Sequence, residues 1–156
     1  MNNIIVRQAV IGDAAEVARV TKDAFAKYAQ MAGITTIEAL NETIGQVESE
    51  IENQHVYVAT LNDEIVGSLR IIAGKVSGTG TLTRFGVSNR HQGLGIGGAL
   101  LDYVDEQIPA LGIKELYLHS ATKVTSLIKF YSTKGFYILS TTNDREYVRA
   151  LMVKEY

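Results

Sequence analysis

The sequence contains no cysteine among its 156 residues. This absence excludes a disulfide framework, a thiolate metal site and a cysteine nucleophile, because each of them needs a thiol group. Any group transfer catalysed by this chain must therefore proceed without a covalent intermediate on a protein sulfur atom. We expect no metal site.

The chain also lacks an apolar run of the about 20 residues that a membrane-spanning helix needs. No charged segment followed by an apolar leader begins at Met1, so no targeting segment is expected. The hydrophobic content of 46% is sufficient for a real core at this length. We therefore expect a soluble, cytoplasmic protein in which residues 1–156 form a single domain.

Clusters of lysine and arginine are missing as well, which argues against a nucleic-acid partner; a membrane partner is not expected either. The net charge is −2. Residues 1–66 nevertheless contain four Lys/Arg against ten Asp/Glu, whereas residues 67–156 contain eleven against seven. This division fits a cationic acceptor bound by the first part of the chain and a polyanionic cofactor bound by the second part. A simple drift of surface charge along the chain explains it equally well.

Hydrophobic periodicity predicts the elements of the first half of the chain. Apolar residues recur at helical spacing after Gly12, and a β-rich hairpin surrounds the pair Asn62-Asp63, which tolerates positive φ angles. The expected elements are a strand over Ile4–Gln8, a helix to about Ala29, a second helix capped by Thr36 with Glu38 in its first turns, and antiparallel strands over His55–Leu61 and Glu64–Ala73.

The second half continues this meander and then alternates helices with strands. Pro109 ends one helix, because proline disfavours the helical conformation in the residue before it. The expected elements are a strand over Thr81–Val87, a helix from about Gly95 to Ile108, a strand over Leu116–His119, a helix over Thr125–Lys134, and closing strands over Phe136–Thr141 and Tyr147–Val153. The order β-α-α-β-β-β-α-β-α-β-β predicts an α+β layer with a mixed sheet.

The most distinctive local feature is the glycine-rich turn from Arg90 to Gly98, between a strand and a helix. The first N–H groups of a helix have no intrahelical partner and carry the positive end of the helix dipole. Glycine lets phosphate oxygens approach the backbone closely. The turn therefore predicts a binding site for a pyrophosphate.

The spacing of Gly93, Gly95 and Gly98 also satisfies the turn of a dinucleotide-binding fold. That turn should follow the first strand of a βαβ unit, with an acidic residue about 20 residues later to hold a ribose. Here the turn follows an antiparallel meander, and the next strand ends in His119-Ser120. A nicotinamide-dependent enzyme is therefore a weaker interpretation, and no Gly-Lys-Ser/Thr of a phosphate-binding loop is present.

Arg90, Gly93 and Gly95 resemble the Gln/Arg-x-x-Gly-x-Gly/Ala motif of the GNAT superfamily of N-acetyltransferases. The segment Phe130–Phe136 resembles the family's Phe-Tyr-x-x-x-Gly-Phe segment at the expected distance downstream. The element order agrees over nearly the whole chain. The resemblance implies a GNAT-like fold, a mixed, mostly antiparallel central sheet flanked by helices, with acetyl-CoA as co-substrate.

By this resemblance, the cofactor lies where the strand ending at Val87 diverges from the strand over Leu116–His119. Pantetheine would pair with the first strand in the manner of β-augmentation. Val124 stands where the family often has an asparagine that contacts pantetheine, so this contact is not expected in the same form. The residues assigned to the cofactor are Phe85, Gly86, Val87, His91, Gln92, Gly93, Leu94, Gly95 and Ile96.

The same resemblance assigns Tyr131 as the general acid that protonates the leaving thiolate. On its helix alone, Tyr131 would be interpreted as a core residue with its hydroxyl at the edge. A backbone N–H near Phe85 would polarise the carbonyl. His119 has a suitable pKa for the general base, and a structural hydrogen-bonding role is the alternative.

Several further residues are candidates for acceptor binding. Glu38, Glu42 and Tyr28 on the first two expected helices could bind the acceptor or assist deprotonation of its amine. Alternatively, they belong to a solvated or core face of these helices. Arg70 and Arg84 could meet an anionic acceptor group, or lie on the surface as cross-strand neighbours. The side chains of His55 and His91 are expected to face solvent.

The leading hypothesis is an N-acetyltransferase that transfers an acetyl group to a primary amine by direct attack in a ternary complex. A non-catalytic acyl-CoA-binding sensor or regulatory module is the alternative from another class. The expected partner is a small-molecule or peptide amine, and such small domains often form homodimers.

Overall fold

A computed structural model describes residues 3–35 and 37–156. Its helices and strands follow the order expected from the sequence. They are β1 (Ile4–Gln8), α1 (Ala14–Ala32), α2 (Ile44–Asn53), β2 (His55–Leu61), β3 (Glu64–Ala73), β4 (Thr79–Val87), α3 (Ile96–Gln107), β5 (Glu115–Ala121), α4 (Thr125–Thr133), β6 (Tyr137–Thr142) and β7 (Arg149–Glu155).

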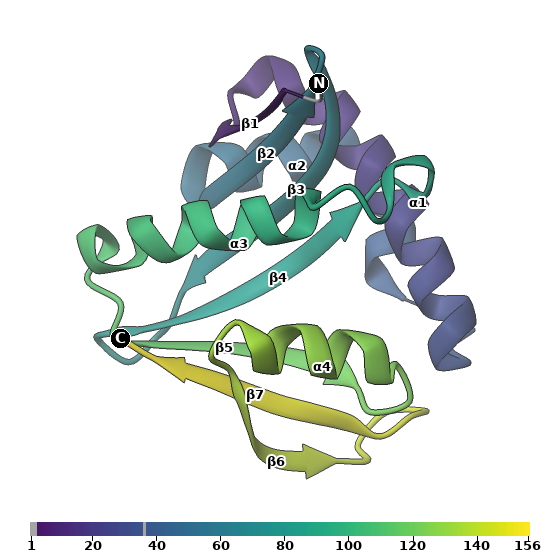
Figure 1. The fold of residues 1–156 in the computed structure, drawn as a ribbon, viewed down its shortest axis with the longest axis vertical. Coiled ribbons are helices and arrows are strands. Elements are labelled where there is room, and N and C mark those ends of the chain that lie inside the picture. The colour runs from purple at the N-terminus through teal and green to yellow at the C-terminus, as the bar shows by residue number, and fades with distance from the viewer. Residues whose placement is uncertain (1–2, 36) are drawn as a thin grey trace.

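The strands form one seven-stranded sheet in the order β1-β2-β3-β4-β5-β7-β6 (Figure 1). Every neighbouring pair is antiparallel except β4 and β5, which are parallel. The expected α+β class with a mixed, mostly antiparallel sheet is therefore confirmed.

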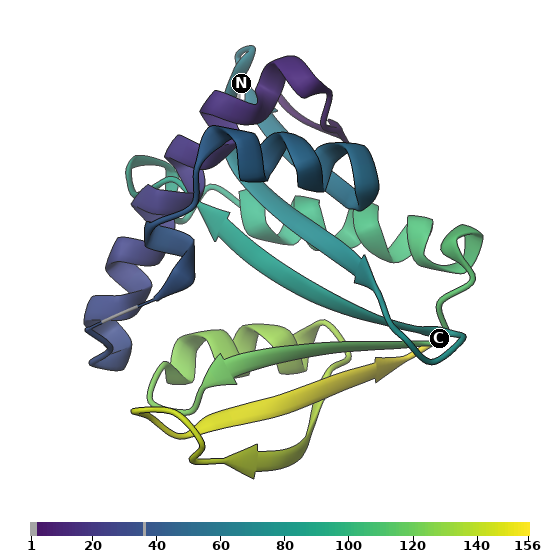
Figure 2. The same cartoon turned by 180° about the vertical axis from the view of Figure 1, so that it is seen from behind.

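Helices cover both faces of the sheet. α3 and α4 lie on the face seen in Figure 1, and α1 and α2 lie on the opposite face seen in Figure 2. Two apolar clusters fill these layers. One packs Leu100 and Val104 of α3 against the sheet, and the other packs Val17 and Val20 of α1 with Val47 of α2 against it.

The strands β4 and β5 pair over only three residues each. The pairs are Thr79 with Glu115, Gly80 with Leu116 and Thr81 with Tyr117. Beyond this short ladder the two strands diverge (Figure 1). After Thr81, the divergence leaves the β5-facing edge of β4 without a strand partner among the described residues, as the family resemblance implies.

A bulge in β4 occurs where the strands diverge. Ser68 pairs with Gly86 and Arg70 with Thr83, so β4 carries one residue more than β3 between these pairs. Arg84, at the bulge, has a φ of 51°, which is uncommon for a residue other than glycine. A bulge bends its strand and redirects side chains, and here it lies beside the open edge of β4.

The turns between elements follow local chemistry. Asn62 and Asp63 adopt φ angles of 51° and 68°, which confirms the expected hairpin turn between β2 and β3. Pro109 lies in a short 3₁₀ turn over Ile108–Leu111, directly after α3 ends at Gln107. The end of this helix is therefore placed as expected.

The start of the second helix was predicted wrongly. Thr36, expected as its cap, lies outside the described residues, and Glu38 belongs to a 3₁₀ turn over Glu38–Leu40. α2 begins at Ile44, and Thr43 caps it. The Thr43 hydroxyl accepts a hydrogen bond from the Gln46 backbone N–H at 3.1 Å, and the Gln46 side chain accepts one from the Thr43 backbone N–H at 2.8 Å.

Within residues 3–35 and 37–156, no helix combines the length and apolar character needed to cross a membrane.

Candidate active site

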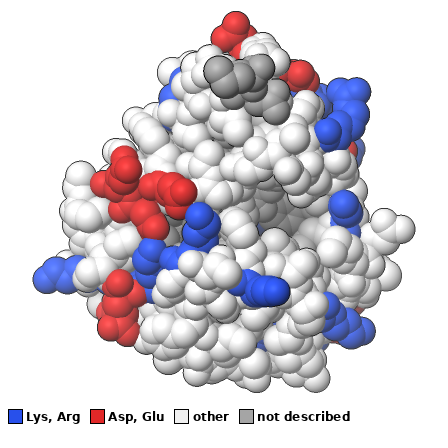
Figure 3. All heavy atoms as spheres, viewed as in Figure 1, with Lys and Arg blue, Asp and Glu red and all other residues white. Residues whose placement is uncertain are grey.

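A cavity of about 730 Å³ occupies the space between the diverging strands. Figure 3 shows a hollow in the face seen in Figure 1, with Lys and Arg side chains at its rim. The lining comes from one side of α1, the open edge of β4, the glycine-rich turn, the start of α3, the end of β5, α4 and the segment before β7. It includes Phe85, Gly86, Val87, His91, Gln92, Gly93, Gly95, Ile96, His119 and Tyr131.

The glycine-rich turn places the start of α3 at the wall of this cavity. Gly93 and Gly95 have φ angles of 76° and 81°, in the left-handed region that favours glycine. A Cβ atom on either residue would meet nothing within 4 Å, so this side of the turn is open. Gly95 caps α3, which begins at Ile96, and its carbonyl accepts from the N–H of Ala99 at 3.0 Å. The N–H groups before Ala99 therefore remain for an anion, and the turn fits a pyrophosphate.

The wall of the cavity formed by β4 is built from close packing. The ring of Phe85 stacks on Phe130 with centroids 6.0 Å apart, and a Cβ on Gly97 would lie 3.1 Å from Phe85 Cζ. A Cβ on Gly86 would lie 2.5 Å from the Cβ of Ala24 in α1. Neighbouring side chains therefore leave no room for a Cβ atom at Gly86 and little room for one at Gly97.

One backbone group of this wall already has a partner. The Gln92 side-chain amide donates a hydrogen bond to the Val87 carbonyl oxygen at 2.9 Å. Gln92 therefore ties the glycine-rich turn to the end of β4. Leu94, which was expected to contact the cofactor, is 42% exposed and is not among the residues that line the cavity.

Tyr131 lies on α4 inside a group of aromatic rings. Its ring centroid is 5.7 to 6.0 Å from those of Phe85, Phe130 and Phe136, and only 6% of the residue is exposed. Burial raises the pKa of the Tyr131 phenol far above its ordinary value, and the nearby Tyr28 adds to this effect. The hydroxyl therefore stays protonated at every working pH.

His119 lies on β5 and is exposed toward the cavity. Desolvation lowers the pKa of its imidazole, and the charges of Arg149 and Arg145 lower it further, against a smaller opposing effect of Asp144. A lowered pKa leaves the ring neutral at pH 7, with a nitrogen that can accept a proton. The electrostatics are therefore compatible with the role of a base.

Tyr28 joins α1 to the end of β5. Its hydroxyl accepts a hydrogen bond from the backbone N–H of Ala121 at 2.8 Å, and burial raises the pKa of the phenol. The same region is closed by an apolar cluster that includes Val124, at the start of α4. Tyr28 therefore positions one wall of the cavity, and Val124 supplies an apolar lining where the family often has an amide.

The family model for the acetyltransferase (GNAT) family matches residues 22–136. The chain belongs to this family. Membership explains the elements that surround the cavity, since acetyl-CoA is the co-substrate that defines the family's reaction. No curated protein sequence matches the chain.

Solved structures share the acetyltransferase fold along nearly the whole chain. PaiA N-acetyltransferase from Thermoplasma acidophilum, in complex with coenzyme A, is 19% identical with a TM-score of 0.83, and the match covers 99% of each chain. A GNAT-family acetyltransferase from Streptococcus pneumoniae is 21% identical with a TM-score of 0.76, covering 98% and 99%. The ribosomal-protein-S18-alanine N-acetyltransferase from Escherichia coli is 16% identical with a TM-score of 0.78, covering 98% and 94%.

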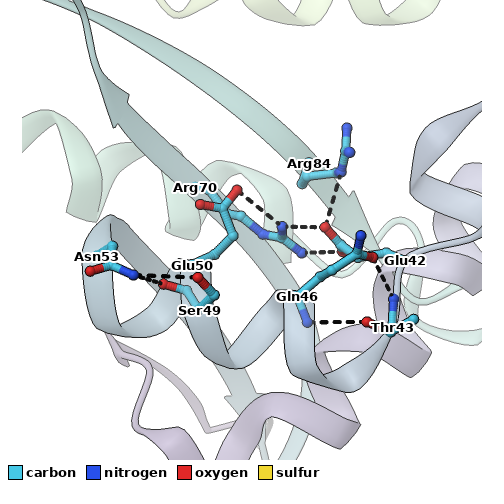
Figure 4. A network of polar contacts seen from close by, with 8 residues as sticks. All are labelled: Glu42, Thr43, Gln46, Ser49, Glu50, Asn53, Arg70 and Arg84. Atoms are coloured by element: carbon cyan, nitrogen blue, oxygen red, sulfur yellow. Dashed lines mark hydrogen bonds and ion pairs between the residues drawn. The ribbon is translucent and has the colours of Figure 1, made fainter.

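Arg70 lies in a buried network beside α2, on the face of the sheet that α1 and α2 cover (Figure 4). Its guanidinium donates two hydrogen bonds to the Glu42 carboxylate at 2.6 and 2.7 Å, and Glu50 lies 3.7 Å away. Arg70 is fully buried, so neither the surface position nor a contact with the acceptor is correct. The prediction for Glu42 is also wrong. Glu42 precedes α2, and its carboxylate oxygens accept the hydrogen bonds of Arg70.

Arg84 extends this network toward the cavity. Its Nε lies 3.7 Å from a Glu42 carboxylate oxygen, and its side chain is 26% exposed. Arg84 and Glu38 both line the cavity, so both remain candidates for contact with an acceptor.

The two histidines expected to face solvent are only half-exposed. His55 begins β2 and is partly buried, and His91 lines the cavity. The Nδ1 atom of His91 is buried and has no hydrogen-bond partner among the described residues. His91 is thus placed to contribute its side chain to the cavity, as well as its backbone.

The cavity residues that were not individually identified from the sequence include two arginines, Arg145 and Arg149. Arg149 begins β7, where it pairs with Ala121 of β5. Strand alternation could have placed Arg149 on the face opposite the buried Ala150, but only once the pairing of β7 with β5 was known. Arg145 lies in a connecting segment without a pattern that predicts its position.

Proposed function

We propose that this chain is an N-acetyltransferase that transfers an acetyl group from acetyl-CoA to a primary amine by direct attack in a ternary complex. The observation that carries the proposal is a single cavity that joins the start of α3, the open edge of β4 and the buried Tyr131. We also propose that residues 1–156 act as one acetyltransferase domain in the cytoplasm.

Each end of the cavity suits one part of the co-substrate. The open N–H groups after Gly95 would bind the pyrophosphate, and the unpaired edge of β4 near Phe85 would bind the extended pantetheine. Support comes from structural neighbours solved with coenzyme A or acetyl-CoA, among them PaiA and the Salmonella typhimurium protein yncA.

Acetyl-CoA, when bound, supplies a thioester carbonyl and a thiolate leaving group. An amine with a pKa near 10.4 is mostly protonated at pH 7, and deprotonating it costs about 4 to 5 kcal/mol. His119 faces the cavity as a neutral base that can accept this proton, directly or through water. The absence of cysteine removes the thiol route, so the amine attacks the carbonyl itself.

Two further groups would act on the charges that develop during transfer. A backbone N–H near Phe85 would donate to the carbonyl oxygen as negative charge forms there. The Tyr131 hydroxyl would donate toward the departing sulfur. Its pKa is raised well above that of a thiol, so this hydroxyl contributes mainly as a hydrogen-bond donor before the proton moves.

Calorimetry combined with a thiol-release assay tests the proposal against its alternatives. Binding of acetyl-CoA with amine-dependent thiol release supports the acetyltransferase. Binding without turnover across amine classes would instead indicate the sensor module, which membership in the family does not favour. Binding of NAD in place of acetyl-CoA would indicate a nicotinamide-dependent enzyme.

A further inference from the structure

The lining of the cavity has an excess of positive charge. Its charged lining residues are four cations, Lys27, Arg84, Arg145 and Arg149, and among the described residues one acid, Glu38. The net negative charge of the first 66 residues therefore does not extend into the cavity. A cationic acceptor would meet repulsion there, whereas an anionic group would be attracted.

Arg145 and Arg149 lie apart from the region proposed for the pyrophosphate. Ala150 and Met152 of β7 are buried in the cluster beneath α3 and α4, so the alternation of side chains places Arg149 on the opposite face of the sheet. Its register partner Ala121 packs with the end of α1, which confirms this orientation. The glycine-rich turn lies at the start of α3, on the other face.

The Arg149 guanidinium has N–H donors without a hydrogen-bond partner among the described residues. Its Nε is buried and has no hydrogen-bond partner among the described residues, and its terminal nitrogen lies 3.7 Å from Asp144, beyond hydrogen-bond distance. The side chain is 16% exposed and lines the cavity. An arginine held this way is ready for a planar anion, because its fork of N–H groups matches a carboxylate in a bidentate geometry.

Arg149 and Arg145 also lie close to the proposed base. The charges of both arginines lower the pKa of the His119 imidazole. An acceptor whose anion contacts these arginines would therefore hold its amine within the same part of the cavity as His119.

We propose that the acceptor is a small amine that also carries a carboxylate, of the amino-acid type, and that Arg149 binds this carboxylate with Arg145 beside it. This inference rests on the proposed acetyltransferase function. It makes Arg149 a specificity-determining residue and assigns no role to it in binding acetyl-CoA.

The test compares amino acids with their carboxamides and with polyamines in the thiol-release assay. The carboxylate forms are expected to have a kcat/KM about 10- to 100-fold above that of the matched carboxamides, the range for hydrogen bonds to charged groups. Arg149→Gln should abolish this preference mainly through KM, and should leave acetyl-CoA affinity unchanged. Arg19→Gln, an exposed arginine on α1 paired with Glu16, serves as the matched control and should retain the preference.

A second readout distinguishes a specific role of Arg149 from a structural one. Loss of its charge should raise the pKa of His119, so the acid limb of the pH–rate profile should move to higher pH in Arg149→Gln. Equal or better turnover of carboxamides or polyamines would overturn the proposal, as would an equal loss for both forms in Arg149→Gln.

If no amine supports thiol release, the proposed function fails and the arginine site is tested by binding alone. Calorimetric titration of the CoA-loaded protein with N-acetyl amino acids and with their carboxamides then replaces the kinetic comparison. Tighter binding of the carboxylate forms, lost in Arg149→Gln, would support the site. Equal binding, or none, would overturn it.

Discussion

The buried pair of Arg70 and Glu42 predicts a large effect of a small substitution. Glu42→Gln preserves the shape of the side chain and removes its charge. Arg70 is fully buried and the Glu42 side chain is 9% exposed, so the guanidinium would keep a neutral amide oxygen at position 42 and, as a carboxylate partner among the described residues, Glu50 at 3.7 Å. Breaking a buried ion pair costs about 3 to 5 kcal/mol, and the remaining acid argues for the lower end, about 3 kcal/mol.

This loss is measured by urea unfolding at pH 7. For a chain of this size, about 3 kcal/mol corresponds to a decrease in Tm of roughly 6 to 12 °C. Glu16→Gln, which breaks an exposed pair with Arg19, is the control and should cost less than about 1 kcal/mol. The double variant with Arg70→Met and Glu42→Gln should be more stable than Glu42→Gln alone, because no unpaired charge remains.

The pKa of Glu42 determines how the difference in unfolding free energy between wild type and Glu42→Gln changes with pH. Burial raises the pKa of the Glu42 carboxyl, but the hydrogen bonds and charge of Arg70, with those of Arg84, outweigh burial and hold the pKa below its ordinary value of 4.5. The stabilisation by Glu42 is therefore present above pH 4.5 and lost as the pH falls through the lower folded pKa. A Glu42→Gln protein within 1 kcal/mol of wild type at pH 7 would refute the assignment of a buried pair.

Three further predictions concern the cavity. Gly95→Glu should abolish acetyl-CoA binding in calorimetry, whereas Gly112→Glu, which imposes a similar backbone strain at a φ of 74° outside the cavity lining, should preserve it; unchanged binding in folded Gly95→Glu would remove the phosphate site. Tyr131→Phe should lower turnover by about 10- to 100-fold with acetyl-CoA affinity within a few-fold, and wild-type turnover with chemistry rate-limiting would end its role as acid. The kcat/KM should fall more steeply as the pH decreases below the lowered pKa of His119, in addition to the slope set by protonation of the amine, and this additional break should vanish in His119→Gln; a break that persists would exclude His119 as the base.

Local signals were sufficient to predict most of the fold. The Asn62-Asp63 turn, the glycines around Gly95 and the single proline each determine backbone geometry within a few residues, and the structure places elements where these residues indicate. The start of α2 was predicted wrongly although its signal is local. Thr43 and Gln46 form a capping box, and this pattern is stronger than the isolated threonine at 36.

The positions that were interpreted wrongly or not identified depend on long-range pairing. Arg70 and Glu42 are 28 residues apart, and only the folded sheet brings them together in the interior. Arg149 reaches the cavity because β7 pairs with β5, which a pattern within β7 alone does not reveal. The turn around Gly95 was predictable because consecutive residues form it, whereas the charged lining of the cavity comes from residues far apart in the chain, namely Lys27, Glu38, Arg84, Arg145 and Arg149.

The most direct test of the central claim is the stoichiometry of the transferred acetyl group. Free coenzyme A thiol and acetylated amine are measured together, by thiol titration and mass spectrometry, in a reaction with acetyl-CoA and a panel of primary amines. Both products are expected in equal amounts and only when the amine is present, and Gly95→Glu is expected to form neither. Tight acetyl-CoA binding with no acetylated amine from any member of the panel would contradict the central claim.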